Sequence, residues 1–177
     1  MTILMKKIIS LFVFLSFNHF ALSQGKAYNF LIGYNTLTDT FTQSPKGRIS
    51  FDSASATAIA DSFKMKFRAT QGNISDENGN LLMVTNGQWI MNALGDTMQN
   101  GQGLNPGSLV NGSPYGMPFP DANLILPYPG YASRYILFHQ SGVVSLNYMS
   151  PEIFITIIDM DSANGLGAVV SKNQVVF

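Results

Sequence analysis

Apolar residues along the chain occur in short runs and in strict alternation, the two patterns that predict β-strands. Residues 71–100 show this best, because turn dipeptides at Asn78-Gly79 and Asn86-Gly87 separate their apolar runs. Asn-Gly is the strongest short-range signal for a β-hairpin, since both residues tolerate the positive φ of a type I′ turn. We therefore predict one antiparallel meander of three or four strands in this stretch.

Apolar and β-branched runs predict further strands on both sides of this meander. Before it, strands are expected at residues 27–34 and 48–52, with a Ser- and Thr-rich loop at 35–47. Residues 53–61 form either a helical turn capped by Ser53 or, as we favour, an extended link. After it, four strands joined by short turns are expected at residues 122–127, 135–139, 153–160 and 167–177. Residues 143–148 add a short strand or belong to an insertion.

Residues 62–70 alternate apolar with basic side chains, which predicts a strand with two unlike faces. The alternating residues are Phe63, Met65 and Phe67 on one face and Lys64, Lys66 and Arg68 on the other. Three cations on one face of a strand could bind an anionic ligand. The same pattern is expected of a strand face that is exposed to solvent, or of an edge strand whose charges prevent pairing with another strand. We favour the solvated face and retain Arg68 as a candidate ligand-binding residue.

Residues 101–121 are so rich in glycine and proline that no helix or ordinary strand is expected there. A loop of this length is uncommon in a compact domain and is often functional. The alternative is that this loop only connects two sheets by passing around the outside of the domain.

The strands fall into two groups, about 27–100 and 122–177, on either side of this loop. Each group has the size of one four-stranded blade. The predicted fold is therefore all-β, with antiparallel meanders forming about two blade-like four-stranded sheets of a partial β-propeller. A closed β-sandwich explains the same strands and is the alternative.

The N-terminus has the pattern of a signal peptide covering residues 1–23. Lys6 and Lys7 precede an apolar run at 8–17, and small residues at Ala21 and Ser23 favour cleavage before Gln24. The apolar run is short and interrupted for a membrane span. We expect no stable membrane span after cleavage, and a single β-rich domain at 24–177.

Charge and composition exclude several functional classes. Only 11% of the residues are charged, and removal of the signal leaves two more acidic than basic side chains, so no nucleic acid partner is expected. The chain has no cysteine, which excludes disulfides, thiolate metal sites and thiol catalysis. No cofactor is expected.

Five segments of the chain resemble the N-terminal β-propeller-like region of large secreted Bacteroidetes proteins. They are SDENGNLLMVTNG at 75–87, GDTMQNGQGLNPG at 95–107, LILPYPG at 124–130, YILFH at 135–139 and IDMDSANGLGAVVSKN at 158–173. The order and spacing match across nearly the whole chain after the signal. The resemblance implies a propeller-like fold and an extracytoplasmic address rather than an activity.

Two features depart from the pattern of these proteins. Met83 and Val84 stand where aromatic residues are common. The related proteins continue through further blades to a C-terminal sorting domain for type IX secretion, whereas this sequence ends at Phe177 after about two blades. Since a propeller needs about four to eight blades, we expect either a fragment of a longer protein or two groups that close on each other. Without a sorting domain, the expected location is the periplasm; if the chain is part of a longer protein that carries one, the expected location is outside the cell or on its surface.

Catalytic and metal sites find little support. His139 is the only histidine after the signal and ends an apolar strand without a nucleophile motif, so a hydrogen-bonding role is favoured. The acidic stretch at 76–80 lacks the order of ligands of a calcium loop and is better explained as a turn. The aspartates show no spacing that pairs two of them for glycoside hydrolysis.

The favoured function is thus a non-enzymatic, exported β-repeat with a structural, adhesive or ligand-binding role, which takes a glycan or a cell-surface protein as partner. An alternative is a carbohydrate-binding β-sandwich that uses Trp89 and the loop at 101–121, although Trp89 lies in an apolar run and is expected in the core. An aspartate-dependent hydrolase is a remote alternative. Open sheet edges would also favour self-association.

Overall fold

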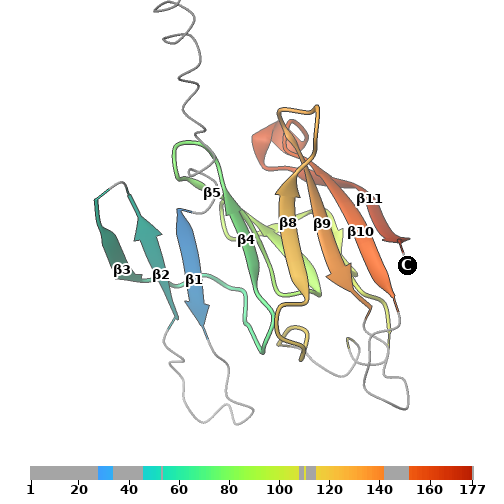
Figure 1. The fold of residues 1–177 in the computed structure, drawn as a ribbon, viewed down its shortest axis with the longest axis horizontal. Helices are drawn as coiled ribbons and strands as arrows, with labels where there is room; N and C mark the ends of the chain where they lie inside the picture. The colour runs from blue at the N-terminus through green and yellow to red at the C-terminus, as the bar shows by residue number, and fades with distance from the viewer. Residues whose placement is uncertain are drawn as a thin grey trace, which may run out of the picture.

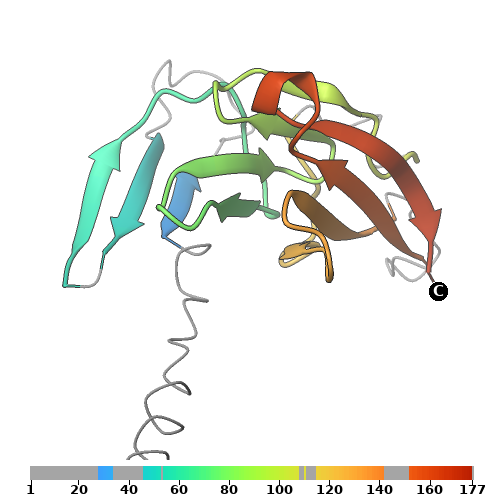
Figure 2. The same ribbon diagram turned by 90° about the horizontal axis from the view of Figure 1, so that it is seen from above.

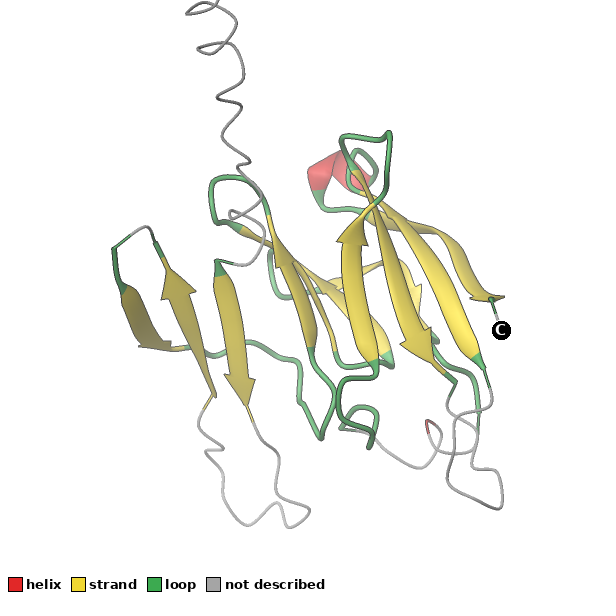
Figure 3. Cartoon of the chain, viewed as in Figure 1, coloured by secondary structure: helices red, strands yellow, loops and turns green. Residues whose placement is uncertain are grey.

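The computed structural model describes residues 28–33, 46–52, 54–107, 110, 115–141 and 152–176. The predicted signal peptide at 1–23, most of the loop at 35–47 and the short strand at 143–148 lie outside these residues. The strands are β1 (Asn29–Gly33), β2 (Lys46–Phe51), β3 (Ala56–Ala60), β4 (Gly72–Ser75), β5 (Leu81–Thr85), β6 (Trp89–Asn92), β7 (Thr97–Gln102), β8 (Asn123–Pro127), β9 (Arg134–Gln140), β10 (Ile153–Asp159) and β11 (Ala168–Val175). A short 3-10 turn, η2 (Ala163–Gly165), connects the last two strands (Figure 3).

The protein is all-β, as predicted. Its larger sheet contains the predicted meander at 71–100 and the predicted group at 122–177, whereas the strands at the start of the expected first group, 27–100, form a separate sheet. The order in this sheet is β4-β5-β6-β7-β11-β10-β9-β8, so each group is an antiparallel meander (Figure 1). The two groups join where β7 and β11 lie parallel, with Gln99 opposite Ala168. Side chains reinforce this join, because Asn100 donates to the Val169 carbonyl and Lys172 donates to the Gln102 carbonyl.

The eight-stranded sheet curls until its two edge strands, β4 and β8, lie side by side. Gly72 on β4 lies so close to β8 that a Cβ there would be 3.2 Å from Asn123 Cβ. The interior of the curl is a core of buried side chains drawn from all eight strands and their connections. Its members are Ile74, Met83, Ile90, Met98, Leu104, Ile125, Tyr135, Leu137, Ile158, Met160 and Val169.

A smaller antiparallel sheet, β1-β2-β3, stands beside β4 and β5 (Figures 1 and 2). A second core, which comprises Leu31, Phe63, Met65, Phe67, Val84 and Met91, holds it against the outer side of β5 and β6. Strand β5 serves both cores, since Met83 points into the curl and Val84 into the second core. This explains why its sequence is a continuous apolar run rather than an alternation.

The arrangement differs from both predicted architectures. The structure does not show a propeller, because the two meanders share one sheet whereas propeller blades are separate sheets. It also does not show a sandwich of two separate sheets. The two meanders form one sheet because β7 pairs with β11. This pairing satisfies backbone groups that would otherwise be left at two open sheet edges.

The two Asn-Gly turns are present, but the prediction of type I′ geometry is wrong. Gly79 and Gly87 both have φ of +84°, whereas Asn78 and Asn86 are not among the residues with positive φ. The Asn86 side chain instead accepts a hydrogen bond from the Gln88 N–H at 3.0 Å, which makes a longer turn stabilised by a side chain.

The strand predicted at residues 62–70 is also wrong. This segment pairs with no neighbouring strand, yet its side chains alternate in burial as the pattern predicts: Phe63, Met65 and Phe67 are buried. The alternation of apolar and basic residues therefore reflects packing of one face on the second core and not hydrogen bonding to a neighbouring strand. The loop predicted at 101–121 begins later in the structure than predicted, because β7 continues to Gln102.

Among the described residues, no helix has the length and apolar character needed to cross a membrane.

Candidate functional site

A cleft of about 680 Å³ lies between the small sheet and the outer side of the large one. One wall is the inward face of β1 and β2, with Leu31, Arg48 and Ser50. The other wall comes from β5, β6 and the turn after β6, with Leu81 and Met91 among its residues. The size suits a small organic ligand, since binding pockets of this kind typically measure about 300–1,000 Å³.

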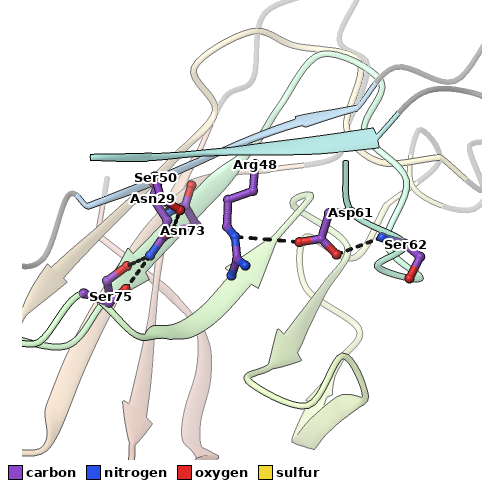
Figure 4. Close-up of polar contacts among 8 residues, drawn as sticks. Asn29, Arg48, Ser50, Asp61, Ser62, Asn73 and Ser75 are labelled. Carbon is purple, nitrogen blue, oxygen red and sulfur yellow. Dashed lines mark hydrogen bonds and ion pairs between the residues drawn. The ribbon is translucent and has the colours of Figure 1, made fainter. Parts of the chain in front are cut away.

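Asn29 fixes one end of the cleft by joining the small sheet to the large one (Figure 4). Its side-chain amide donates to Ser75 Oγ at 2.8 Å and to the Gly79 carbonyl at 2.7 Å. Its Oδ1 accepts from Ser50 Oγ at 2.9 Å, and its carbonyl accepts from Asn73 Nδ2 at 2.7 Å. These bonds hold the two walls at a set separation.

Arg48 is the most distinctive residue of the cleft. Its Nε atom is buried and has no hydrogen-bond partner in the described part of the chain, and the nearest carboxylate oxygen, Asp61 Oδ2, is 3.8 Å away. That distance is an ion pair but too long for a hydrogen bond. Asp61 is engaged elsewhere, because its Oδ1 accepts from the Ser62 N–H at 2.8 Å (Figure 4). Among the described residues the Nε donor is therefore unused, and about a third of the Arg48 side chain (32%) is exposed.

The rim of the cleft carries a second ion pair and a rigid turn. Lys64 Nζ lies 2.5 Å from Asp96 Oδ1, with both side chains mostly exposed. The buried Asn92 side chain accepts hydrogen bonds from the Leu94 and Asp96 N–H groups, which fixes the turn between β6 and β7. Of the cleft-lining residues, Asp61 is the only acidic one and Arg48 and Lys64 are the basic ones.

The cleft therefore combines three kinds of surface. Arg48 offers donors in a planar fork that fits a carboxylate. Ser50, Ser62 and Asn80 offer neutral hydroxyl and amide groups, and Leu31 and Met91 supply an apolar wall. A ligand that has one carboxylate, several hydroxyl groups and an apolar side satisfies all three.

The two residues predicted to bind ligand lie elsewhere. Arg68 is exposed on the segment before β4, and Trp89 is half-buried against the second core. Neither of them lines the cleft. The other two cations of the predicted strip have separate partners, since Lys64 pairs with Asp96 and Lys66 lies over the Tyr115 ring at 5.0 Å.

Part of this site could have been found in the sequence. In RISFD, Arg48 and Ser50 alternate with Ile49 and Phe51, which places the two polar residues together on one face. The proximity of Asp61 depends on the hairpin register, in which Arg48 lies opposite Ile59 and Gly47 opposite Ala60. That register is set by the turn between β2 and β3, in which the Asp52 carboxylate accepts hydrogen bonds from the Ala54 and Ser55 N–H groups.

His139 occupies a buried polar network within β9 and does not line the cleft. Its Nδ1 bonds to Asn105 Oδ1, and its Nε2 lies 2.8 Å from Thr156 Oγ1. Thr156 Oγ1 also accepts from the Asn173 N–H at 3.2 Å. Because Asn105 Oδ1 can only accept, His139 Nδ1 donates, and in the neutral ring Nε2 accepts from the Thr156 hydroxyl. Burial lowers the pKa of His139 to about 4.

Asn105 links this network to the first meander. Its side-chain amide donates to the Gly87 carbonyl at 2.8 Å, and its N–H donates to Asn173 Oδ1 at 3.3 Å. Every polar atom around His139 is thus satisfied within the fold, as expected for a structural histidine. The one hydroxyl bonded to the ring, that of Thr156, is fully buried, so no substrate can reach it in this structure.

The acidic turn at 76–80 is a structural turn, as predicted. Asp76 Oδ1 accepts from the Asn78 and Asn80 N–H groups, and its Oδ2 accepts from Asn80 Nδ2. Burial alone would raise the pKa of Asp76, but the hydrogen bonds from Asn80, Asn78 and Gly79 outweigh it and lower the pKa. Within the described ranges, no cluster of three or more His, Asp or Glu residues could hold a metal ion.

Comparison of the chain with protein-family models, with curated proteins and with solved structures gives no match.

Proposed function

We propose that this chain is an exported, non-enzymatic β-repeat protein that binds a small acidic ligand in the cleft between its two sheets. The observation that carries the proposal is Arg48, whose buried Nε has no hydrogen bond within the described residues and whose nearest carboxylate among them is 3.8 Å away. A buried donor without a partner costs about 1–3 kcal/mol. A ligand carboxylate that bonds to it recovers this energy.

The neutral lining of the cleft supports a hydroxyl-rich ligand. Ser50, Ser62 and Asn80 can each exchange hydrogen bonds with hydroxyl groups, and the apolar wall at Leu31 and Met91 can pack against the carbon face of a sugar ring. A uronic acid, which is a sugar with one carboxylate, has this combination of groups. We therefore assign the ligand class as an acidic sugar.

The residues that line the cleft support binding of the ligand without its hydrolysis. Hydrolysis of a glycoside requires two carboxylates about 5–10 Å apart. Among the described residues, Asp61 is the acidic one that lines the cleft, and it already accepts from the Ser62 N–H, while Asp96 at the rim is paired with Lys64.

The binding proposal is tested by titrating the purified protein with sodium galacturonate and, as a neutral control, with galactose. We expect galacturonate to bind and galactose to bind much more weakly. Arg48→Gln should weaken galacturonate binding by about tenfold or more, because a hydrogen bond to a charged group contributes about 1.5–3 kcal/mol.

Arg68→Gln is the matched control, because it removes the same charge from an exposed residue outside the cleft. If both variants bind galacturonate as the parent does, the cleft is not the site. If Arg68→Gln alone weakens binding, the cation strip predicted from the sequence is the site instead.

The resemblance to large secreted Bacteroidetes proteins is part of this proposal. The presence of two four-stranded meanders in the expected order supports it. Under this proposal the chain is one segment of a longer surface protein. Sequencing the DNA downstream of codon 177 tests it, since an open frame that encodes further strand groups is expected and an unrelated frame would argue against it.

A further inference from the structure

Among the described edge strands of the two sheets, β3 is the one whose outer edge is exposed along its whole length. Strand β1 is tied to β4, because Asn73 Nδ2 donates to the Asn29 carbonyl, and β4 lies against β8 at Gly72. Strand β3 pairs with β2 alone in the described part of the chain, and all of its residues are exposed (Figure 1). An open edge of this kind is a row of unpaired backbone N–H and C=O groups to which another strand can pair.

Hydrogen bonds at the two ends of the β2–β3 hairpin define its pairing pattern. The Asp52 N–H donates to the Ser55 carbonyl at 3.0 Å, and the Asp61 N–H donates to the Lys46 carbonyl at 3.0 Å. The register runs without a shift between these two pairs. In an antiparallel ladder, opposite residues alternate between pairs that exchange hydrogen bonds and pairs that do not, so the two end pairs fix the pattern for the whole strand.

This pattern shows which backbone groups of β3 point away from the sheet. Thr57 and Ile59 occupy the positions that bond to β2. The positions between and beside them are alanines, which direct their N–H and C=O groups outward: Ala56, Ala58 and Ala60. Their spacing of two residues matches the alternate residues of an extended chain. The free donors and acceptors therefore select a β-strand as the occupant of this edge.

Strand β3 lacks the features that usually protect a sheet edge. Natural edges carry charged side chains, proline or a bulge. The strand sequence ATAIA has no charge and no proline, and its pairing with β2 has no bulge. At the outward positions the side chain is a single methyl group, so a second backbone can approach to the usual strand separation of about 4.8 Å.

A hollow of about 330 Å³ lies on the outer face of the small sheet beside this edge. Small residues on β2 and β3 leave the space, and two larger apolar side chains border it; the five are Gly47, Ala58, Ala60, Ile32 and Ile49. A strand added to β3 would place every second side chain on this face. A large apolar side chain at one of those positions would fill the hollow.

The N-terminal end of β3 is acidic. Asp52 is exposed just before the strand and lines a second hollow together with Glu77. Hydrogen bonds from the Ala54 N–H and from the hydroxyl and N–H of Ser55 lower the pKa of Asp52, so its carboxylate is charged at neutral pH. A partner strand that runs antiparallel to β3 has its C-terminal end here. A basic residue at that end would complement the charge.

We propose that the free edge of β3 binds an extended peptide segment of another protein, which adds to the small sheet as an antiparallel fourth strand. The segment alternates polar residues with large apolar ones and carries a basic residue at its C-terminal end. In this mode of recognition, backbone hydrogen bonds provide affinity and pockets for alternate side chains provide specificity. Residues 56–60 do not line the cleft, so this site is separate from that of the acidic ligand.

A second copy of this chain fits the edge less well than such a peptide. Only residues with outward backbone groups can pair, so two β3 edges would set alanine beside alanine and leave the hollow unfilled. The antiparallel arrangement would also bring the end of one strand that carries Asp61 beside the end of the other that carries Asp52. Like charges across a strand pair are destabilising.

Isothermal titration calorimetry with a synthetic peptide of about nine residues tests the proposal. The peptide alternates threonine with leucine, phenylalanine and valine, ends in lysine, and is blocked at both termini. We expect it to bind the parent protein with a Kd below about 1 mM. The same peptide with N-methyl groups on the amides that face β3 should bind about tenfold more weakly or worse, because it cannot donate to the edge.

Two further peptides test the specificity of the edge. Alanine in place of the leucine, phenylalanine and valine should weaken binding about tenfold, because the hollow stays unfilled. Glutamate in place of the lysine should also weaken binding, and added salt should reduce that difference. Equal binding of all these peptides would overturn the proposal.

Ala58→Pro tests the same site from the side of the protein. Proline removes the outward N–H of this residue without removing a hydrogen bond to β2, and an edge strand tolerates it there. The variant should keep the circular dichroism spectrum of the parent and bind the first peptide about tenfold more weakly or worse. Ala58→Ser is the matched control, because it keeps the N–H and a small side chain, and it should bind like the parent.

Three results would contradict the proposal. They are a parent protein that does not bind the first peptide at about 1 mM, an N-methylated peptide that binds equally well, and a folded Ala58→Pro variant that binds like the parent. Sedimentation equilibrium covers the other occupant. Self-association of the parent that Ala58→Pro abolishes, without any binding of the peptide, would assign the edge to a second copy of the chain.

Discussion

At the scale of single residues, His139 should make the stability of the protein depend on pH. Its pKa is about 4 in the folded state and about 6.5 when exposed, so the unfolded chain binds more protons between these values. The stabilisation is complete above pH 6.5 and is lost as the pH falls toward 4. The full effect is about 3 kcal/mol at most.

Urea unfolding of the parent and of His139→Gln at pH 7.5 and pH 4.5 measures this effect. The carboxylates titrate alike in both proteins, so the difference between the two isolates the histidine. We expect the free energy of unfolding to fall more steeply with acid in the parent. Equal slopes would show that His139 keeps an ordinary pKa in the fold.

The sequence predicted some residue roles and missed others for a physical reason. The hydrogen-bonding role of His139 and the turn role of Asp76 follow from local patterns, and the structure confirms both. The role of Arg48 depends on what lies opposite it across a cleft between two sheets. That relation comes from tertiary packing, which strand alternation alone does not specify.

At the scale of elements, the segment at residues 61–71 attaches the small sheet to the large one. Met65 is fully buried in the second core, so Met65→Ala should reduce the free energy of unfolding by about 2–5 kcal/mol. Lys64→Ala is the neighbouring control and should cost less than about 1 kcal/mol, because it removes only an exposed ion pair.

Urea unfolding followed by circular dichroism gives both values. Similar small losses in the two variants would mean that this segment does not anchor the small sheet. The comparison also separates the two meanings of an alternating sequence. Here alternation predicts burial correctly and strand pairing wrongly, because a chain can pack one face on a core without a neighbouring strand.

At the scale of the whole molecule, stability depends on the side chains that join the two meanders. Asn173 donates to the Gly103 carbonyl at 2.9 Å and accepts from the Asn105 N–H. Asn173→Gly keeps the positive φ of 54° accessible but removes these bonds, and it should cost about 1–3 kcal/mol. The exposed neighbour Gln174 provides the control, and Gln174→Ala should change the free energy of unfolding by about 0.5 kcal/mol or less.

Unfolding curves of both variants check this prediction. An Asn173→Gly variant as stable as the parent would show that backbone pairing between β7 and β11 is sufficient. The sequence predicted the meander at 71–100 and the strands at 122–177, but not the join between them. A parallel pairing between the ends of two meanders leaves no local signal, whereas each antiparallel hairpin has a turn sequence of its own.

The position of Trp89 gives the protein an internal optical reporter. It is the only tryptophan in the chain, and it packs against the second core, where the small sheet meets the large one. Its fluorescence therefore senses the contact between the two sheets rather than the interior of the eight-stranded curl. If the small sheet separates before the curl unfolds, tryptophan emission will shift to longer wavelength at lower urea concentration than the loss of β-sheet ellipticity.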